Sequence, residues 1–375
     1  MSPSTALKRT LFSGTSLPIN SLLHNPKQPP IQTANFSTSS PFLIHVSKSY
    51  ISSHTTSQNM PLSTSSPTQK TWRLPPGSWD THVHVFDPET YPYSPTRAYS
   101  PRSASFNQLT TFGQSLTTNN SAPNMVLVLP SPYGTLNESI LDLLRKKEGG
   151  GKLRGIVVLD SEQMTRENLL EMDKLGVRGV RLNMVSSGGS VTGDALRKAL
   201  IETAGLIKDA GLGGKWWIQL FIPGHFWDEL SETVRNLGVG IIADHLGGMK
   251  GSSMLEQGAT VTEQPGFDAL IALASSKHLV VKVSGFPRAS EDEKAAYPDL
   301  EAVVKRFAVE VPDQLIWASD WPHTGEAKDR KGRSINVPEP FRDIDDVAIL
   351  KRLRSWVSVD VWEKMMAGTP GKIFA

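Results

Sequence analysis

Short apolar runs alternate with longer segments of mixed polarity along the chain from residue 79 onward. Several of the runs are almost unbroken Val, Ile and Leu, which is typical of parallel strands covered on both faces. The segments between them, such as 135–150, 165–176 and 193–211, carry apolar residues at helical spacing. The pattern predicts eight strands, at 79–86, 124–130, 153–160, 177–183, 215–222, 239–248, 278–285 and 314–321.

Eight strand–helix units in roughly 300 residues predict an α/β protein of the (β/α)8 TIM-barrel type. We expect a single domain over residues 71–375. A doubly wound open sheet is the alternative, but no glycine-rich phosphate loop follows the first apolar run.

The first 70 residues differ sharply in composition from the rest. They contain no Asp or Glu, five basic residues and many Ser, Thr, Pro and Asn. This composition is typical of an organelle transit peptide, and equally of a disordered leader without a targeting signal. We therefore expect residues 1–70 to be a disordered leader or transit peptide, and the protein to be mitochondrial or cytoplasmic.

Net charge and cysteine content limit which binding partners and which kinds of catalytic or metal site the sequence can have. The whole chain has 39 basic and 37 acidic residues, which leaves 34 basic and 37 acidic residues after the leader. A near-neutral body gives no indication of nucleic-acid binding, and no stretch approaches the roughly 18 apolar residues of a membrane span. The absence of cysteine excludes disulfides, thiolate metal sites and cysteine nucleophiles. The expected partner is a small-molecule substrate.

The stretch "WDTHVHVFDP" at residues 79–88 places two histidines one residue apart in an apolar run. In a strand, residues i and i+2 share a face, so His82 and His84 should project side by side, with Asp80 and Phe86. Burying two imidazoles together is costly unless something binds them. The alternative is that both are ordinary, satisfied histidines of the core or surface.

In a TIM barrel the chemistry lies where the strands end, so the polar residues that end each run are informative. Arg181, in "RGVRLN", should point into the barrel mouth, where a guanidinium needs either an acidic neighbour or an anionic ligand. The other residues of this kind are His82, His84, Ser131, Asp160, Asn183, Gln219, Asp244, His245, Ser284, Asp320 and His323.

Three motifs in order, "DTHVHVF", "DHLGG" and "SDWPH", resemble the amidohydrolase superfamily, specifically amidohydrolase-related family 2. The likeness extends over about residues 75–375 and is greatest to the branch that contains 2-pyrone-4,6-dicarboxylate lactonase and sugar-acid lactonases. It implies a catalytic centre in which Asp320 takes a proton from water and histidines polarise the scissile carbonyl. The implied catalytic residues are His82, His84, His245, Asp320 and, close by, His323.

The same resemblance implies where a substrate would bind. Tyr99, Ser131, Arg181 and Arg288 are similar to the positions that hold the substrate's carboxylates in the lactonases. Those enzymes have a second arginine six residues after the one in the fourth strand, whereas this chain has Ser187. The difference implies a substrate with one carboxylate, or a lactone with hydroxyls instead.

His82, His84, His245 and Asp320 could also supply the ligands of one zinc ion. A binuclear site would need a bridging Lys or Glu near the end of the fourth run and a histidine in the fifth, and the sequence has neither. Because the lactonase branch works without a required metal, we predict a metal-independent hydrolase of a small carboxylate-bearing lactone, with no cofactor. The alternatives are one bound zinc, as in a metal-dependent decarboxylase of the superfamily, and a non-catalytic metabolite-binding barrel.

Overall fold

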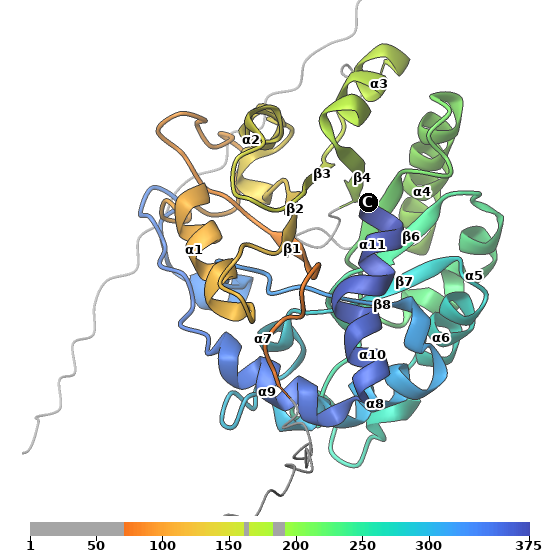
Figure 1. Ribbon diagram of the computed structural model, residues 1–375. Helices are drawn as coiled ribbons and strands as arrows, with labels where there is room; N and C mark the ends of the chain where they lie inside the picture. Colours follow the sequence, from red (N-terminus) through yellow and green to blue (C-terminus); the bar gives the residue numbers. More distant parts are fainter. Residues whose placement is uncertain (1–70, 161–164, 183–191) are drawn as a thin grey trace, which may run out of the picture. The chain divides into compact units, whose positions relative to one another are not determined.

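Eight parallel strands form one sheet in which each strand pairs with the next along the chain (Figure 1). The computed structural model describes residues 71–160, 165–182 and 192–375, so the predicted leader lies outside the described residues. The strands are β1 (Trp79–Val83), β2 (Asn124–Val128), β3 (Leu153–Val157), β4 (Val177–Leu182), β5 (Trp217–Leu220), β6 (Gly240–Ala243), β7 (Leu279–Val283) and β8 (Leu315–Trp317). All eight predicted strands are confirmed, and the predicted TIM barrel with them.

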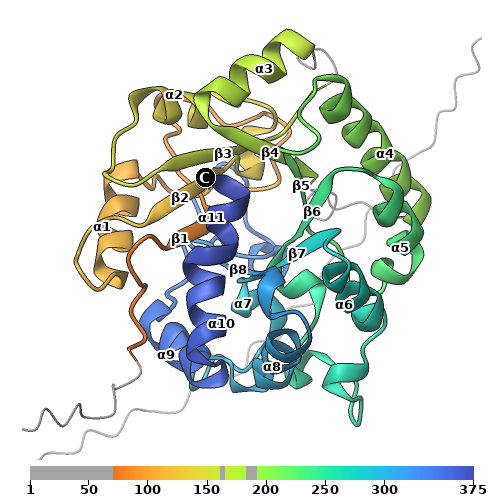
Figure 2. The same ribbon diagram turned by 45° about the vertical axis from the view of Figure 1, so that its right-hand side comes forward.

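Helices lie between the strands and cover the outside of the barrel (Figures 1 and 2). They are α1 (Phe106–Leu116), α2 (Glu138–Lys146), α3 (Arg166–Leu175), α4 (Gly193–Asp209), α5 (Phe226–Asn236), α6 (Phe267–Ser275), α7 (Phe286–Ala289), α8 (Glu301–Glu310), α9 (Asp346–Trp356), α10 (Val359–Glu363) and α11 (Thr369–Phe374). Local sequence sets several of these boundaries. Thr165 caps α3 by accepting the Asn168 N–H, and Gly176 ends that helix in the left-handed conformation. Within the described residues, no helix combines the length and the apolar character needed to cross a bilayer.

The interior of the barrel has an apolar floor. Side chains from alternate strand positions pack there around Phe374, whose ring lies 5.7 Å from that of Trp79 at the start of β1. α11, which carries Phe374, therefore closes the end at which the strands begin. The interior near the other end is polar, because His82, Gln219, Lys282 and Asp320 are all buried there. This leaves the carboxyl ends of the strands as the position for a site.

The barrel closes between β1 and the segment that follows β8. The Asp320 N–H donates to the His82 carbonyl at 3.1 Å, and the His84 N–H donates to the Trp321 carbonyl at 2.9 Å. These two bonds join the His pair directly to the segment that carries Asp320, although the residues are far apart in the sequence.

All eight strands are shorter than the apolar runs that predicted them, and three of them carry site residues just beyond or at their ends. β1 ends at Val83, β6 at Ala243 and β8 at Trp317. For β6 and β8 the physical reason is the backbone that follows: His245 has φ of 51° and Asp320 has φ of 65°, in the left-handed region that a strand cannot contain. His245 and Asp320 therefore stand on sharp turns that begin just after β6 and β8.

Candidate active site

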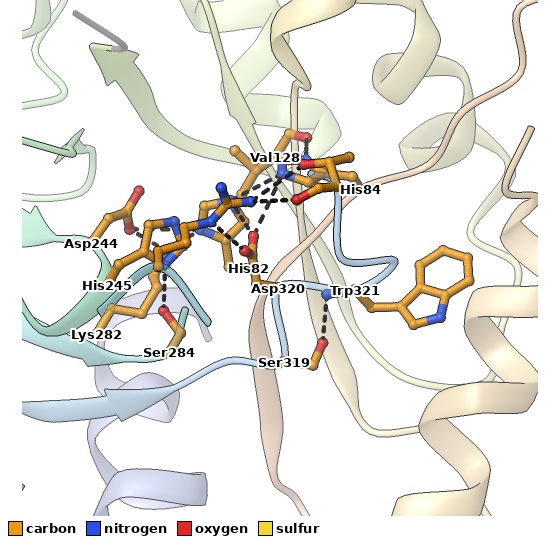
Figure 3. A network of polar contacts seen from close by, with 12 residues as sticks. His82, His84, Val128, Asp244, His245, Lys282, Ser284, Ser319, Asp320 and Trp321 are labelled. Carbon is orange, nitrogen blue, oxygen red and sulfur yellow. Dashed lines mark hydrogen bonds and ion pairs between the residues drawn. The ribbon is translucent and has the colours of Figure 1, made fainter. Parts of the chain in front are cut away.

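Four of the predicted catalytic side chains meet at the carboxyl ends of β1, β6 and β8. The His82 Nε2 atom lies 3.3 Å from His84 Nε2 and 3.7 Å from Asp320 Oδ1. The His245 ring stacks on the His82 ring, with 5.2 Å between the ring centroids. Figure 3 shows the side chains of His82, His84 and Asp320 directed at one another. The prediction that the two histidines of "WDTHVHVFDP" project side by side is therefore confirmed.

Main-chain and hydroxyl partners orient two of the imidazoles. The His84 Nδ1 atom lies 2.8 Å from the Val128 carbonyl, which can only accept a hydrogen bond, so Nδ1 carries the proton and Nε2 is free to accept. The His245 Nδ1 atom is 2.9 Å from the Ser284 hydroxyl.

All three imidazoles are held neutral near pH 7. Burial, together with the Arg181 guanidinium, lowers the pKa of His84 to about 4. Burial also lowers the pKa of His245 to about 4 and holds the pKa of His82 well below its usual value. Uncharged imidazoles can accept or donate hydrogen bonds without repelling the cations around them.

Asp320 is the ionised partner of these neutral rings. Its Oδ2 atom accepts from the Nε of Arg288 at 3.0 Å, and its Oδ1 atom faces the histidine pair. Burial alone would raise the pKa of this carboxyl, but Arg288 and the histidines outweigh burial and hold the pKa well below its usual value. A buried, ionised carboxylate with one oxygen beside neutral imidazoles can accept a proton.

The structure also places the predicted substrate-binding residues. Arg181 is buried and donates from Nη1 to the Leu129 carbonyl at 3.2 Å, while its Nε atom has no hydrogen-bond partner within residues 71–160, 165–182 and 192–375. The half-buried Tyr99 lies under the Arg330 guanidinium, 3.7 Å from the ring centroid. Ser131 begins a short 3-10 turn just after β2. Ser187 lies outside the described residues.

The ion-pair interpretation of Arg181 finds no support among the described residues, because none of their carboxylates lies within 4.0 Å of it. Asp244, Tyr99 and Asp320 are near enough to favour its charged form, although burial has the larger effect and lowers its pKa. A buried guanidinium that makes a single hydrogen bond to the described residues, and whose Nε pairs with none of them, is typical of an anion-binding group.

His323 turns toward the last long helix. Its Nε2 atom is 2.8 Å from a carboxylate oxygen of Asp346 in α9, and its backbone N–H bonds to the Asp320 carbonyl at 3.0 Å. Burial would lower the pKa of His323, but the Asp346 carboxylate outweighs burial and raises it. His323 therefore contacts Asp320 through the main chain.

The His323–Asp346 pair is expected to make stability depend on pH. Because the pKa of the folded-state histidine is raised, its contribution is fully present below the unfolded value of about 6.5 and is lost as pH rises through the folded pKa. We expect His323→Gln to lower the free energy of unfolding by about 1.5–3 kcal/mol at pH 6, as for a charge-assisted hydrogen bond. The difference from wild type should shrink toward pH 9, measured by denaturant unfolding. A difference that stays constant with pH would show that the pair is not charged.

Sequence reasoning missed Lys282, which lies in β7 with no exposed surface. Its Nζ atom is 2.8 Å from Asp244 Oδ1, 2.9 Å from Gln219 Oε1 and 3.3 Å from His82 Nδ1. A signal was present in "HLVVKVSG", because Lys282 shares a strand face with Ser284, which does contact a catalytic candidate. The predicted site is therefore larger than the motif residues alone.

Known proteins resemble this chain over most of its described length. The amidohydrolase family profile matches residues 79–353. The chain is 31% identical over 254 residues to 4-sulfomuconolactone hydrolase from Hydrogenophaga intermedia, which covers 67% of this chain and 77% of that protein. It is 29% identical over 261 residues to 2-pyrone-4,6-dicarboxylate hydrolase from Comamonas testosteroni, which covers 68% of this chain and 80% of that protein.

Solved structures show the same architecture. A protein from Pseudomonas putida described as a 2-pyrone-4,6-dicarboxylic acid hydrolase superposes with a TM-score of 0.59 at 25% identity, covering 80% of this chain and 97% of the other. A protein from Agrobacterium tumefaciens superposes with a TM-score of 0.61 at 18% identity, over 80% and 97% of the two chains. Fold and site together define a TIM-barrel hydrolase. The chain belongs to the amidohydrolase family, as its motifs indicated.

Proposed function

We propose that this enzyme opens the ring of a small lactone that carries a carboxylate. The observation that carries the proposal is the meeting of one ionised carboxylate, Asp320, with the neutral histidines His82, His84 and His245. The relatives named as lactone hydrolases support it. Activated esters need only a base for water and donors for the carbonyl oxygen, and this site holds both.

The reaction follows from the positions of these groups. Asp320 Oδ1 takes a proton from water as the water oxygen attacks the lactone carbonyl carbon. N–H groups of His82 and His245 donate to the carbonyl oxygen and stabilise its negative charge in the tetrahedral intermediate, whereas the only N–H of His84 is bound to the Val128 carbonyl. The intermediate then collapses, the bond between the carbonyl carbon and the ring oxygen breaks, and the proton on Asp320 passes to the leaving oxygen.

Two arginines are the candidates for the substrate's carboxylate. Arg181 contributes a buried guanidinium whose Nε has no hydrogen-bond partner in the part of the chain that the structure describes. Arg288 already binds Asp320 through Nε and Thr324 through Nη2, at 3.0 and 3.3 Å. A substrate carboxylate that shared Arg288 would draw positive charge away from Asp320 and make that carboxylate a stronger base.

A zinc ion fits these residues poorly. His82 Nε2, His84 Nε2 and Asp320 Oδ1 lie close enough together to be ligands. A zinc-bound imidazole, however, normally donates its other N–H to an acceptor, and the other nitrogen of His82 faces two donors, Lys282 Nζ at 3.3 Å and Gln219 Nε2 at 3.4 Å. The charges of Lys282 and Arg288 also oppose a dication. We therefore propose that hydrolysis proceeds without a bound metal.

The test is hydrolysis of a panel of lactones with and without a ring carboxylate, followed as acid release by the full-length protein before and after exhaustive chelation. We expect turnover of carboxylate-bearing lactones, at a rate that chelation leaves unchanged within twofold. Loss of activity on chelation and its return with zinc would contradict the metal-free reaction. Release of CO2 from a carboxylic acid, with no turnover of any lactone, would contradict lactone hydrolysis itself.

A further inference from the structure

Lys282 is a buried cation at the back of the active site, on the side of His82 that faces away from Asp320. Its three neighbours are oxygens of Asp244 and Gln219 and the Nδ1 atom of His82, at 2.8, 2.9 and 3.3 Å. Figure 3 shows Lys282 and Asp244 beside His245 and His82. Neither the family's motifs nor the proposed reaction gives this lysine a role.

An ammonium group has three hydrogens and no acceptor, and three acceptors surround this one. The carboxylate of Asp244 is ionised: burial would raise its pKa, but the Lys282 ammonium outweighs burial and lowers it. The Gln219 Oε1 atom accepts from Lys282, which fixes the amide so that its Nε2 donates to Asp244 Oδ2 at 2.8 Å. The third hydrogen of Lys282 is left for His82 Nδ1.

The Nδ1 atom of His82 is consequently surrounded by donors. Lys282 Nζ lies 3.3 Å away and Gln219 Nε2 lies 3.4 Å away. The nearest carboxylate oxygen, Asp244 Oδ1, is 3.7 Å away, beyond hydrogen-bonding range, and forms an ion pair with Lys282 at 2.8 Å. An imidazole nitrogen between two donors must be the unprotonated one.

The neighbouring histidine requires the same arrangement. Because His84 donates from Nδ1 to the Val128 carbonyl, its Nε2 is an acceptor. That acceptor lies 3.3 Å from His82 Nε2, so the two rings make one hydrogen bond only if the proton of His82 is on Nε2. We propose that Lys282 is a positioning residue that holds His82 as the Nε2–H tautomer. In the free enzyme this N–H donates to His84 Nε2, and in the reaction the lactone carbonyl oxygen replaces His84 as its acceptor.

The catalytic part of this inference rests on the proposed lactone hydrolysis, whereas the tautomer does not. Lys282 also determines what His82 cannot do. Without the lysine, Asp244 Oδ1 would be free to accept from His82 Nδ1, and His82 Nε2 would become a ligand for a dication. A neutral residue at position 282 should therefore increase the affinity of the site for zinc.

Nitrogen-15 spectra of histidine-labelled, full-length protein measure the tautomer directly, with His82→Gln to assign the signals. We expect the wild-type His82 to carry its proton on Nε2 and to shift toward Nδ1–H in Lys282→Met. In that variant kcat for the best lactone should fall about 100-fold, as when one oxyanion donor is lost, with KM within about threefold. The apparent zinc affinity, measured by competition with a chromogenic chelator, should rise at least tenfold.

Arg178→Met is the matched control, because it also removes a buried cation that pairs with an aspartate, Asp173, but near the start of β4. It should change neither the His82 signals nor kcat by more than about twofold. If Lys282→Met does not fold, the charge-neutral Lys282→Met/Asp244→Asn variant is measured instead, with the same loss of kcat expected.

A wild-type His82 protonated on Nδ1 would overturn the inference, as would a Lys282 variant that keeps both the wild-type tautomer and kcat. The spectra need no substrate, so the two proposals can fail separately. An Nε2–H signal in a protein that hydrolyses no lactone would support the assignment of the His82 tautomer to Lys282 and refute the proposed function. Lactone turnover with an Nδ1–H signal would support the proposed function and refute the inference about Lys282.

Discussion

Asp320→Asn is expected to lower kcat for lactone hydrolysis by about 10³-fold, within the range for loss of a general base. The amide keeps the volume of the side chain and can still accept from the Nε of Arg288, which lies 3.0 Å from Asp320 Oδ2. It cannot take a proton from water. The backbone N–H that joins this residue to the His82 carbonyl is unaffected. Steady-state kinetics, with circular dichroism and the thermal midpoint as checks on folding, measure the effect.

Asp320→Ala with added formate separates a chemical role from a structural one. The alanine leaves a space beside Arg288 that a small carboxylate can occupy, so formate should restore kcat at least tenfold over the unaided variant. Acetate is the matched larger ion and should restore less. Wild-type kcat in Asp320→Asn would refute the general-base role.

Arg181→Met is expected to raise KM for a carboxylate-bearing lactone by about 10- to 100-fold and to change kcat little. A charge-assisted hydrogen bond to a buried guanidinium contributes about 1.5–3 kcal/mol, and a loss of uniform binding appears in KM. The side chain is buried, and among the described residues no carboxylate pairs with it. Initial-rate kinetics on two lactones that differ only in the carboxylate measure the effect.

Arg178→Met again gives the control, because it makes the same substitution three residues earlier in the same strand. Arg178 pairs with Asp173, so its loss should lower the thermal midpoint and leave KM unchanged. The quantity that decides is the change in KM that Arg181→Met causes for the lactone with a carboxylate, compared with the change for the lactone without one. An equal rise of KM for the lactone without a carboxylate would mean that Arg181 shapes the pocket and does not bind the anion.

Patterns local to one strand predicted the framework and the motif residues of this protein. Apolar runs identified all eight strands because parallel barrel strands are covered on both faces. The spacing of His82 and His84 predicted a shared face because side chains alternate in a strand. The conformations of His245 and Asp320 could not be predicted in this way, since a non-glycine residue with positive φ depends on the contacts around it.

The partners of the motif residues depend on register between strands, which no local pattern contains. Ala243 pairs with Val281, so the register brings the next residues, Asp244 and Lys282, side by side. In the sequence, Lys282 is only one lysine in an apolar run. The same limit applies to His323, whose partner Asp346 begins a helix 23 residues later.

The barrel closes between β1 and the segment after β8, so the two sides of the closure are synthesised at different times. His82 emerges from the ribosome more than 200 residues before Asp320, and the helix that carries Phe374 follows later still. The Asp80 carboxylate likewise accepts a hydrogen bond from the Ser319 N–H, which lies 239 positions later in the sequence. A nascent chain can assemble most of its βα units in turn, but the outer edge of β1 stays unpaired until the segment after β8 has been made. The active site can therefore form only after the segment that carries Asp320 has been synthesised, long after the strand that carries His82 and His84.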